Sequence, residues 1–320
     1  MINSVRNTVQ GVLNKNNYGY ISPQDFNLYA KQAQMEIFEE YFTAYNKVIN
    51  MENGRVAGTD YADIEQPLAE VLEFFLRSDF LVPILTPSGF TVNQWSAPTL
   101  VTVGFDYYMI NKLLCYTLKR ATGQNTATIP LNQLIDSGAS FVNAGVVYGD
   151  VVVNLTTLES ATVMAVTATA LDLSANIFLA IGDDYAVYAG TSAVDAEKVS
   201  VGKITMLNNS MLTAPSTIFP VYTLDNSSVV TAYPNSITGY GAVNATYFRY
   251  PLDPKWTYIT LASGEPLFDQ TQLDYQDFEL PLEEEYKLAQ KILQYCGMTI
   301  RETEVVQYTI GQEASRTANT

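Results

Sequence analysis

Apolar and polar residues alternate at the spacing of an α-helix along the N-terminal part of the chain. A first apolar run covers residues 2–13. Residues 22–25, Ser-Pro-Gln-Asp, then supply an N-cap, a proline at the first helical position and an acid in the first turn. These signals predict a long helix that starts at Pro23 and stops at Asn53, followed by a third helix over residues 64–75.

Later segments give mixed patterns. Turn-rich residues 83–98 predict an irregular β segment, residues 107–118 predict another helix, and residues 198–207 predict a helix before further β segments. The last helix is the clearest. Pro281 opens it, three successive glutamates occupy the first turn, where the positive end of the helix dipole favours them, and Gly297 ends it.

The composition changes abruptly in the middle of the chain, because no Lys or Arg lies between Arg120 and Lys198. Short runs rich in Val, Ala and Thr are separated there by Gly-Asp and Leu-Glu-Ser turns, which is typical of an all-β domain. We therefore predict a small inserted barrel or sandwich. We also expect that residues between Ile135 and Tyr188 can be replaced by a short Gly/Ser linker without unfolding the rest of the protein.

The C-terminal residues 301–320 predict an extended assembly arm. Val306, Tyr308 and Ile310 alternate with polar residues in the two-residue rhythm of a strand, for which the sequence shows no partner strand. Such a strand either pairs with a sheet edge of another subunit or stays disordered until assembly supplies that edge. A frayed terminus is the alternative. The three apolar residues are candidate interface residues.

Together the patterns predict an α+β protein, in which a helical core with β segments carries an inserted small all-β domain. Its four parts are an N-terminal helical part of the core (1–132), the inserted β domain (133–194), the remainder of the core with β segments and the C-terminal helix (195–300), and the assembly arm (301–320).

Charge and histidine content narrow the function. The 320 residues carry 17 basic and 33 acidic side chains, for a formal net charge of −16, and contain no histidine. The lack of imidazole removes histidine-based triads and histidine-ligated metals. An acidic surface repels the phosphates of DNA and of anionic membranes. No stretch reaches the roughly 18 apolar residues of a membrane span, and the N-terminus lacks the apolar core of a secretory signal, so we expect no membrane partner.

Several motifs resemble functional sites only in part. Residues 14–25 imitate a calcium-binding loop but offer Asp25 as their only carboxylate, and a helix end followed by a cap explains the same residues. Residues 239–241 begin like a dinucleotide fingerprint without its third glycine. The acidic groups Asp183-Asp184 and residues 283–285 fit solvated turns. Two cysteines, Cys115 and Cys296, are typical of small buried apolar residues. We assign no catalytic, cofactor-binding or metal-ligating residue and expect that the protein is not an enzyme.

Aromatic residues crowd the segment before the last helix, among them Tyr247, Tyr250, Trp256 and Tyr258. Tyrosine and tryptophan are enriched at protein interfaces and on sugar-binding platforms. A β segment must also bury one aromatic face in its own core. Core packing and subunit contact therefore both stay open for these four candidate interface residues.

Three stretches together resemble virion structural proteins of tailed bacteriophages of Bacteroidetes and their relatives, notably the short-tailed crAss-like phages. The first is SVRNTVQGVLNKNNYGYISPQDFNLYAKQAQMEIFEEYF at residues 4–42. The second is SMLTAPSTIFPVYTL, followed by AYPNSI and FRYPLDPKWTYI. The third is DFELPLEEEYKLAQKILQYCGM at residues 277–298. The predicted insert separately resembles a small β module that occurs among phage structural proteins.

The resemblance implies a helical connector core without catalysis. The protein would be an adaptor or ring subunit of the head-to-tail connector, stacked under the portal in a ring of twelve copies. Its partners would be further copies of itself, the portal protein and neighbouring tail or ring proteins. DNA would be only a passing cargo, which an acidic lumen would not hold. The resemblance thus implies a location in the virion, at the tail or the head-to-tail junction, after assembly in the host cytoplasm.

Two other functions stay open. The aromatic residues and the paired acids also fit a glycan-binding or glycan-cleaving tail protein, for which Asp183→Asn or Asp184→Asn would abolish an activity. A decoration protein on the capsid is the second alternative. The position of the chain in the assembled particle distinguishes these cases from a connector ring.

Overall fold

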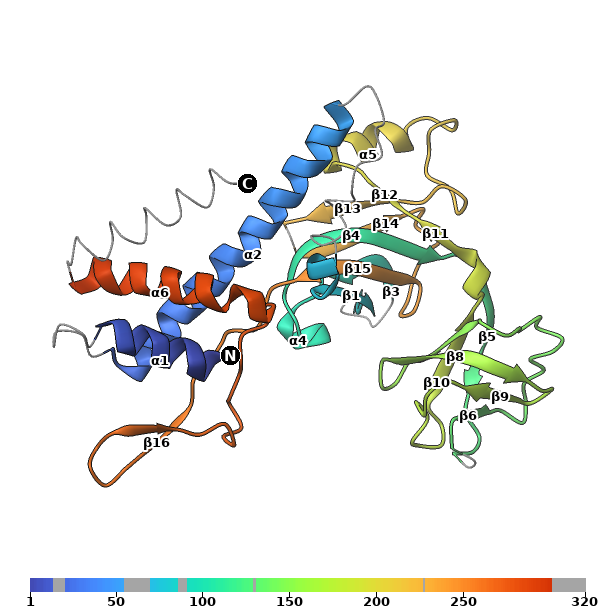
Figure 1. The fold of residues 1–320 in the computed structure, drawn as a ribbon. Helices are drawn as coiled ribbons and strands as arrows, with labels where there is room; N and C mark the ends of the chain where they lie inside the picture. The colour runs from blue at the N-terminus through green and yellow to red at the C-terminus, as the bar shows by residue number, and fades with distance from the viewer. Residues whose placement is uncertain (14–20, 55–69, 86–90, 129–130, 227, 301–320) are drawn as a thin grey trace. The chain divides into compact units, whose positions relative to one another are not determined.

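The computed structural model describes residues 1–13, 21–54, 70–85, 91–128, 131–226 and 228–300 (Figure 1). The chain divides into two compact units. The first unit combines the two ends of the chain, residues 1–75 and the residues from 251 onward, and the second consists of residues 76–250.

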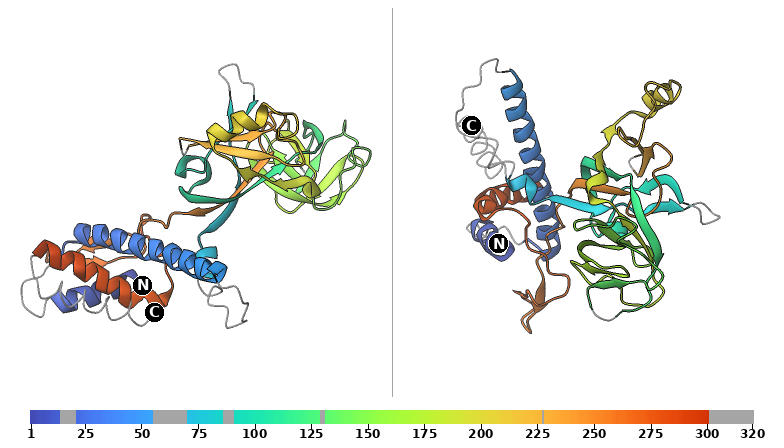
Figure 2. Two further views of the ribbon diagram at one scale, coloured as in Figure 1. Left: turned by 90° about the horizontal axis from the view of Figure 1, so that it is seen from above. Right: turned by 90° about the vertical axis from the view of Figure 1, so that its right-hand side faces the viewer.

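The described part of the first unit is mainly helical and also contains one short β-hairpin. Its long helices are α1 (Ile2–Leu13), α2 (Pro23–Gly54) and α6 (Glu285–Ile300), and the short 3-10 helix η3 (Leu282–Glu284) precedes α6. Ser22 caps α2 as the sequence predicts, because its Oγ accepts a hydrogen bond from the Asp25 backbone N–H at 3.1 Å. α6 packs against both α1 and α2, as the two views of Figure 2 show. The three helices bury their apolar stripes, which contain Ile2, Val5, Val9, Phe26, Ala30, Ala33, Ile37, Phe38, Leu288, Ile292 and Cys296.

Ion pairs join α6 to α2. Lys291 Nζ lies 2.9 Å from a carboxylate oxygen of Glu36 and 2.9 Å from one of Glu40, and Lys287 Nζ lies 2.5 Å from Glu40. Burial of Glu40 disfavours its charged form, but the hydrogen bonds from Lys287 and Lys291 outweigh burial, so the pKa of Glu40 lies below its ordinary value. These contacts add a charged seam to the apolar packing of the two helices.

Trp256 fixes the chain to α1 and α2 just before a short hairpin, β16 (Tyr258–Thr260) and β17 (Pro266–Phe268). Its indole N–H donates to Asn3 Oδ1 at 3.1 Å, and the Arg6 guanidinium lies 3.7 Å from the centroid of the indole. Asn27 exchanges two hydrogen bonds with the Trp256 backbone, at 2.8 and 3.2 Å. Trp256 is therefore a buried anchor of the first unit.

The second unit is built of β-strands, and two of its sheets form a half-barrel around one core. The first sheet has the order β1 (Leu76–Phe80), β15 (Val243–Arg249), β4 (Tyr107–Tyr116), β11 (Ala193–Asp195). The second has the order β12 (Glu197–Lys198), β13 (Val221–Asp225), β14 (Val229–Tyr233), β3 (Thr91–Ser96), β2 (Pro83–Leu85). All these neighbours are antiparallel except β12 and β13. Trp95, Leu113, Val230, Val243 and Tyr247 are among the core side chains.

Two short helices, α4 (Leu100–Val103) and α5 (Val201–Asn208), lie between strands of the half-barrel along the chain. Thr99 caps α4 through a reciprocal pair of hydrogen bonds with Thr102. Ser200 caps α5, whose Ile204 packs with Val199 and Val221. The helix predicted over residues 198–207 is therefore confirmed, with its start at Val201.

Six further strands form a small barrel (Figure 1). Their order is β5 (Lys119–Gln124), β10 (Asp184–Tyr188), β7 (Val151–Asn154), β8 (Glu159–Val166), β9 (Ala170–Leu173), β6 (Gln133–Ile135). The barrel closes just after β5, where Ala127 forms a β-bridge to Ile135 and the Thr126 N–H donates to the Ile135 carbonyl at 2.7 Å. Its interior buries Leu134, Phe141, Val152, Val163, Leu171, Phe178, Tyr185 and Val187.

The barrel and the half-barrel share a hydrophobic core. Val153 of β7 and Ala186 and Tyr188 of β10 belong to the same buried cluster as Trp95. The Gly241 backbone passes so close that a Cβ there would lie 2.8 Å from both Tyr188 and Val153, and its φ of +81° favours glycine. The barrel is therefore packed into the second unit, and this shared core argues against the expectation that the insert can be replaced without unfolding the rest of the protein.

The predicted fold class is wrong. The protein is mostly β, with more described residues in strands than in helices, and it is not a helical core with an inserted β domain. Described helix in the N-terminal part ends before β1, whereas the predicted helical part extended to residue 132. Apart from α4, α5 and the 3-10 helix η2 (Gly190–Ser192), the described helical residues belong to the first unit.

The strand β4 accounts for the largest single error. Residues 107–118 predict a helix, yet they contain the longest strand of the described chain. The buried residues Ile110, Leu113 and Cys115 are three and then two positions apart. That spacing arises because the pairing with β15 shifts by one residue between Lys112 and Ile110, which is a β-bulge. A helix also buries residues three positions apart, so this spacing in the sequence predicts a helix instead of a strand.

Two further expectations concern the C-terminal region. Gly297 does not end the last helix, because α6 continues to Ile300 and Gly297 is buried inside it. A glycine costs only about 1 kcal/mol in a helix interior, which packing on α1 and α2 can offset.

The predicted arm at 301–320 lies outside the described residues, as does most of the calcium-loop-like segment. Among the described helices, none combines the length and the apolar character that a membrane crossing requires.

Candidate assembly surfaces

A row of exposed apolar side chains covers α5 and the loop that follows it. We name it the apolar loop surface, and it consists of Val201, Met206, Met211, Leu212, Ile218 and Phe219. Met211 and Leu212 are as exposed as in an extended chain, at 102% and 97%, and Phe219 is 76% exposed. Exposed apolar patches rimmed by polar residues mark interaction sites of soluble proteins.

Hydrogen bonds hold this loop in shape although its side chains are not buried. Ser216 and Phe219 exchange backbone hydrogen bonds at 3.2 Å each, the Ala214 N–H donates to the Ser210 carbonyl at 2.9 Å, and Thr213 Oγ1 donates to the Leu207 carbonyl at 3.1 Å. At its start the loop continues from the capped helix α5. The backbone therefore presents the apolar side chains in a defined conformation.

The same segment lacks charge. No Asp, Glu, Lys or Arg lies between Lys203 and Asp225, in a chain with 50 charged residues among 320 (17 basic and 33 acidic). A solvated loop of this length ordinarily carries charged side chains, because they are the residue types that proteins leave exposed. The composition of the segment is that of the buried centre of an interface, from which charged residues are depleted.

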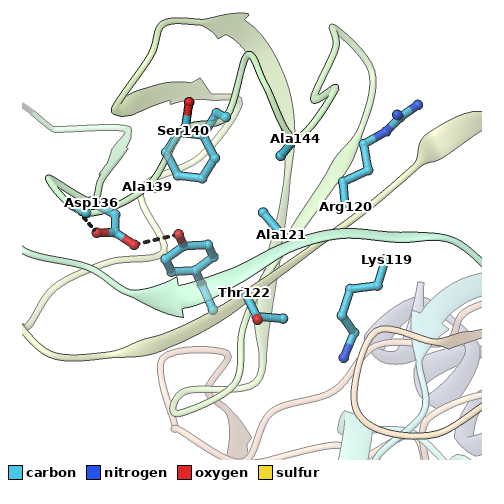
Figure 3. Close-up of a pocket in the computed structure, with 11 residues that line it drawn as sticks. Lys119, Arg120, Ala121, Thr122, Asp136, Ala139, Ser140 and Ala144 are labelled. Atoms are coloured by element: carbon cyan, nitrogen blue, oxygen red, sulfur yellow. Dashed lines mark hydrogen bonds between the residues drawn. The ribbon is translucent and has the colours of Figure 1, made fainter.

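A second feature is an open seam in the wall of the barrel, between β5 and residues 136–144 (Figure 3). The two segments diverge beyond the bridge from Ala127 to Ile135 and leave a cavity of about 400 Å³, which we name the barrel seam. Its walls consist mainly of small residues, namely Ala121, Thr122, Gly138, Ala139, Ser140 and Ala144. Figure 3 shows Ala139, Ser140 and Ala144 across the cavity from the side chains of β5.

A hydrogen-bonded pair closes one end of the barrel seam. The Tyr185 hydroxyl donates to Asp136 Oδ2 at 2.7 Å, and Asp136 Oδ1 accepts the Gly138 N–H at 2.9 Å. Burial, and then the hydrogen bond to Asp136, raise the pKa of Tyr185, so its hydroxyl keeps its proton. A Cβ at Gly123 would lie 2.6 Å from Asp136 Oδ2, so this pair requires glycine in β5.

Both cations of the barrel border the seam. Lys119 and Arg120 are the last basic residues before Lys198, and both line the cavity. Arg120 Nε lies 2.9 Å from Asp150 Oδ2, which is buried. Lys119 forms no ion pair with any described residue; its Nζ lies 5.4 Å from the centroid of the Tyr188 ring, and burial lowers its pKa. Lys119 is thus a partly desolvated cation without an anion beside it.

Two of the predicted interface residues lie in the second unit. Tyr247 is fully buried in the core of the half-barrel, and its hydroxyl donates to Asp79 Oδ2 at 2.9 Å. Burial, together with that hydrogen bond, raises the pKa of Tyr247. Tyr250 is 38% exposed and packs edge-on against Tyr108, with ring centroids 5.3 Å apart. Of Tyr247 and Tyr250, only Tyr250 is therefore accessible to a partner.

The other two predicted aromatic residues lie in the first unit. Trp256 is 1% exposed, whereas Tyr258 is 36% exposed and stacks on the indole with centroids 5.5 Å apart. The structure therefore does not bring Tyr247, Tyr250, Trp256 and Tyr258 together within one unit. The remaining candidate interface residues, Val306, Tyr308 and Ile310, lie outside the described residues.

The paired acids Asp183 and Asp184 do not form a joint site. Asp183 is buried, contrary to its expected role as a surface acid, and its carboxylate accepts a hydrogen bond from Asn154 Nδ2 at 3.0 Å. Asp184 is exposed and accepts a hydrogen bond from Gln124 at 3.0 Å. Within the described residues, no three Asp, Glu or Cys side chains form a group that could hold a metal ion.

The two cysteines are free and buried, as the sequence predicts. Burial raises the pKa of both Cys115 and Cys296 to about 12, which leaves them as protonated thiols at neutral pH. They contribute to packing in the half-barrel and in the first unit.

Sequence reasoning missed both surfaces. For the apolar loop surface a signal existed, namely an apolar segment without charge that carries two Pro and several Asn, Ser and Thr residues. For the barrel seam no local signal existed, because its two walls come from segments whose divergence depends on the barrel closure at Ala127 and Ile135.

No protein-family model matches this chain, and no curated protein matches it either.

Proposed function

We propose that the protein is a phage virion structural protein, a subunit of an oligomeric ring in the head-to-tail connector through which DNA passes. Its partners in this role are further copies of itself, the portal protein and neighbouring tail or ring proteins. The proposal is supported by the resemblance of three stretches of the sequence to such proteins. The observation on the structure that carries it is the apolar loop surface.

The apolar loop surface favours a permanent protein contact. Burying one side chain of the size of Leu, Met or Phe stabilises a contact by about 1.5–3 kcal/mol relative to its exposed state. Six such side chains lie on a segment whose backbone hydrogen bonds already fix its shape, so association orders little additional chain. A chain that folded to act alone would gain nothing from exposing them.

The charge of the molecule is consistent with a DNA passage. With a formal net charge of −16, the protein repels the phosphate backbone and would let DNA pass without holding it. The uncharged segment between Lys203 and Asp225 removes that self-repulsion at the place where copies would meet. An acidic protein with an uncharged contact segment would repel DNA and would still allow its copies to meet without charge repulsion.

The experiment is a charge substitution in the apolar loop surface. We expect the full-length protein to associate into a discrete oligomer, and the double variant Leu212→Lys/Phe219→Lys to remain monomeric, because two charges would be buried without partners. Sedimentation equilibrium measures the oligomeric state. Leu273→Lys is the matched control, because Leu273 is 106% exposed but belongs to the first unit.

Two results contradict the proposal. One is a wild-type protein that stays monomeric throughout the micromolar range. The other is an oligomer that forms equally well in the double variant and in the control, because the apolar loop surface then takes no part in the contact.

A further inference from the structure

The outer edge of β5 is open. On its inner side β5 pairs with β10, and the ladder continues where the Asn125 N–H donates to the Asp183 carbonyl and the Asn125 carbonyl accepts the Gly182 N–H, both at 3.0 Å. Because backbone groups alternate along a strand, the N–H and C=O groups of Thr122 and Gln124 point away from β10, in the same sense as the Thr126 N–H, which donates to the Ile135 carbonyl. Beyond that bridge no described strand pairs with this edge, and the barrel seam lies beside it.

The barrel seam has the shape that an extended peptide needs. Small residues form both walls, so space for side chains is left beside a strand edge that offers backbone donors and acceptors. A peptide that adds to such an edge gains main-chain hydrogen bonds, and alternate side chains enter the adjacent pocket. The cavity of about 400 Å³ is large enough for two or three such side chains.

One cation at the seam, Lys119, is open to an acidic group of an occupant, whereas Arg120 pairs with Asp150 and the acid that lines the cavity, Asp136, accepts the Tyr185 hydroxyl. Lys119 lies at the cavity without an ion-pair partner among the described residues, and Arg120 is the only other cation of the barrel. An acidic peptide would give Lys119 the anion that it lacks. A basic or neutral peptide would not.

One segment of the chain has the matching pattern. Residues 304–310, EVVQYTI, alternate Val306, Tyr308 and Ile310 with polar residues, which predicts a strand. Glu302 and Glu304 lie at its start. The segment follows the last described residue of α6, Ile300, by only a few positions, and the sequence offers it no neighbouring strand as a partner.

We propose that the barrel seam binds residues 304–310 of a second copy of this chain, which add a strand to the outer edge of β5. The inference deepens the proposed ring function, on which it rests for the presence of a neighbouring copy. Val306, Tyr308 and Ile310 lie on one face of the added strand and enter the cavity, while the polar residues between them face its mouth, and Glu302 or Glu304 pairs with Lys119.

The first test measures binding of a peptide. A fluorescent peptide with the sequence of residues 302–312 is titrated with the full-length protein, and its anisotropy is followed. Thr122→Pro removes the outward N–H of β5, which the ladder with β10 does not use, so the barrel keeps its pairing while the edge is blocked. We expect about tenfold weaker binding, the equivalent of a lost backbone hydrogen bond.

Matched variants separate strand addition from misfolding. Thr122→Val keeps the backbone N–H and should bind as the wild type does. Ala144→Trp fills the cavity from the wall opposite β5, leaves the backbone of β5 unchanged and should weaken binding as Thr122→Pro does. Lys119→Glu should weaken it by about threefold, and less at high salt. The proposal is overturned if the peptide does not bind, if it binds Thr122→Pro and Ala144→Trp as well as wild type, or if a scrambled peptide binds equally.

The second test asks which copy supplies the strand. Thr122→Cys is introduced in one full-length protein and Thr309→Cys in another that carries a size tag, and the two are mixed under mild oxidation. We expect a disulfide between the two proteins, and none when Met164→Cys, an exposed residue of β8 on the same barrel, replaces Thr122→Cys. The native cysteines are buried and do not compete. Equal cross-linking of Met164→Cys, or cross-linking only within one chain that carries both substitutions, overturns the assignment to a second copy.

The two tests also separate this inference from the proposed function. If no ring forms but the peptide binds at the seam, the ring function fails and the strand acceptor stands. If a ring forms and the peptide does not bind, the strand acceptor fails and the ring function stands.

Discussion

Single side chains determine how the first unit responds to pH. Glu40 on α2 is half-buried beside Lys287 and Lys291 of α6, and hydrogen bonds from both lysines outweigh the effect of burial and lower its pKa below 4.5. A carboxylate with a lowered folded-state pKa stabilises the fold fully above its unfolded-state pKa. This stabilisation is lost as the pH falls through the folded-state value.

We therefore predict that the stabilising effect of Glu40 disappears in acid. The urea midpoint of the wild type should exceed that of Glu40→Gln at about pH 7, and the difference should shrink toward zero as the pH falls below 4.5 and through the lowered folded-state pKa of Glu40. Urea unfolding followed by helical circular dichroism measures both proteins. A difference that stays constant or grows in acid would mean that the charge of Glu40 is not what joins α6 to α2.

The aromatic residues show how far residue-level reasoning reaches. In β15 the odd-numbered positions are buried and the even-numbered ones are less so, which places Tyr247 in the core and Tyr250 on the surface side. The two-residue period alone could have separated these two tyrosines. The burial of Trp256 could not have been predicted, because it depends on Asn3, Arg6 and Asn27, which lie far away in the sequence.

At the scale of elements, local signals were sufficient for helix starts and insufficient for strands. The cap at Ser22 and the proline before η3 act within one turn of their helix, so the sequence locates them. The strand β4 depends on pairing with β15, more than a hundred residues later, and its bulge produces a helix-like spacing. The mostly β character of the second unit follows from such long-range pairings, which one sequence does not reveal.

The barrel provides a prediction at this scale. Replacement of residues 135–188 by a short Gly/Ser linker removes Val153, Ala186 and Tyr188 from the core around Trp95 and removes β10 from β5. Loss of several buried side chains costs about 2–5 kcal/mol each, so the half-barrel should unfold or become molten. The helical unit supplies none of these contacts and should stay folded.

The two tryptophans report on the two units separately. Trp95 is buried in the half-barrel and Trp256 in the first unit, so Trp95→Phe and Trp256→Phe backgrounds isolate each signal. After the replacement we expect acrylamide to quench Trp95 strongly and Trp256 weakly, with helical circular dichroism retained. If Trp95 stays protected, the barrel is the independent module that the sequence predicted.

The whole molecule combines an acidic composition, an uncharged apolar loop and an open strand edge. Each has an explanation alone, but the proposed oligomeric ring would account for all three, because neighbouring copies would cover the apolar loop surface and supply a strand for the barrel seam. The acidic remainder then suits a passage for DNA. The alternative of a glycan-binding or glycan-cleaving protein receives no support from the paired acids, because Asp183 is buried and Asp184 is exposed, so the two do not form one site.

Electron cryomicroscopy of the assembled particle tests this account most directly, because it locates the chain and its contacts in one map. We predict a closed ring of this chain at the head-to-tail junction, with Met211, Leu212 and Phe219 buried against the next copy. The account would be contradicted by a map that places the chain on the capsid shell or at a fibre tip, or by a ring in which the apolar loop surface remains in solvent.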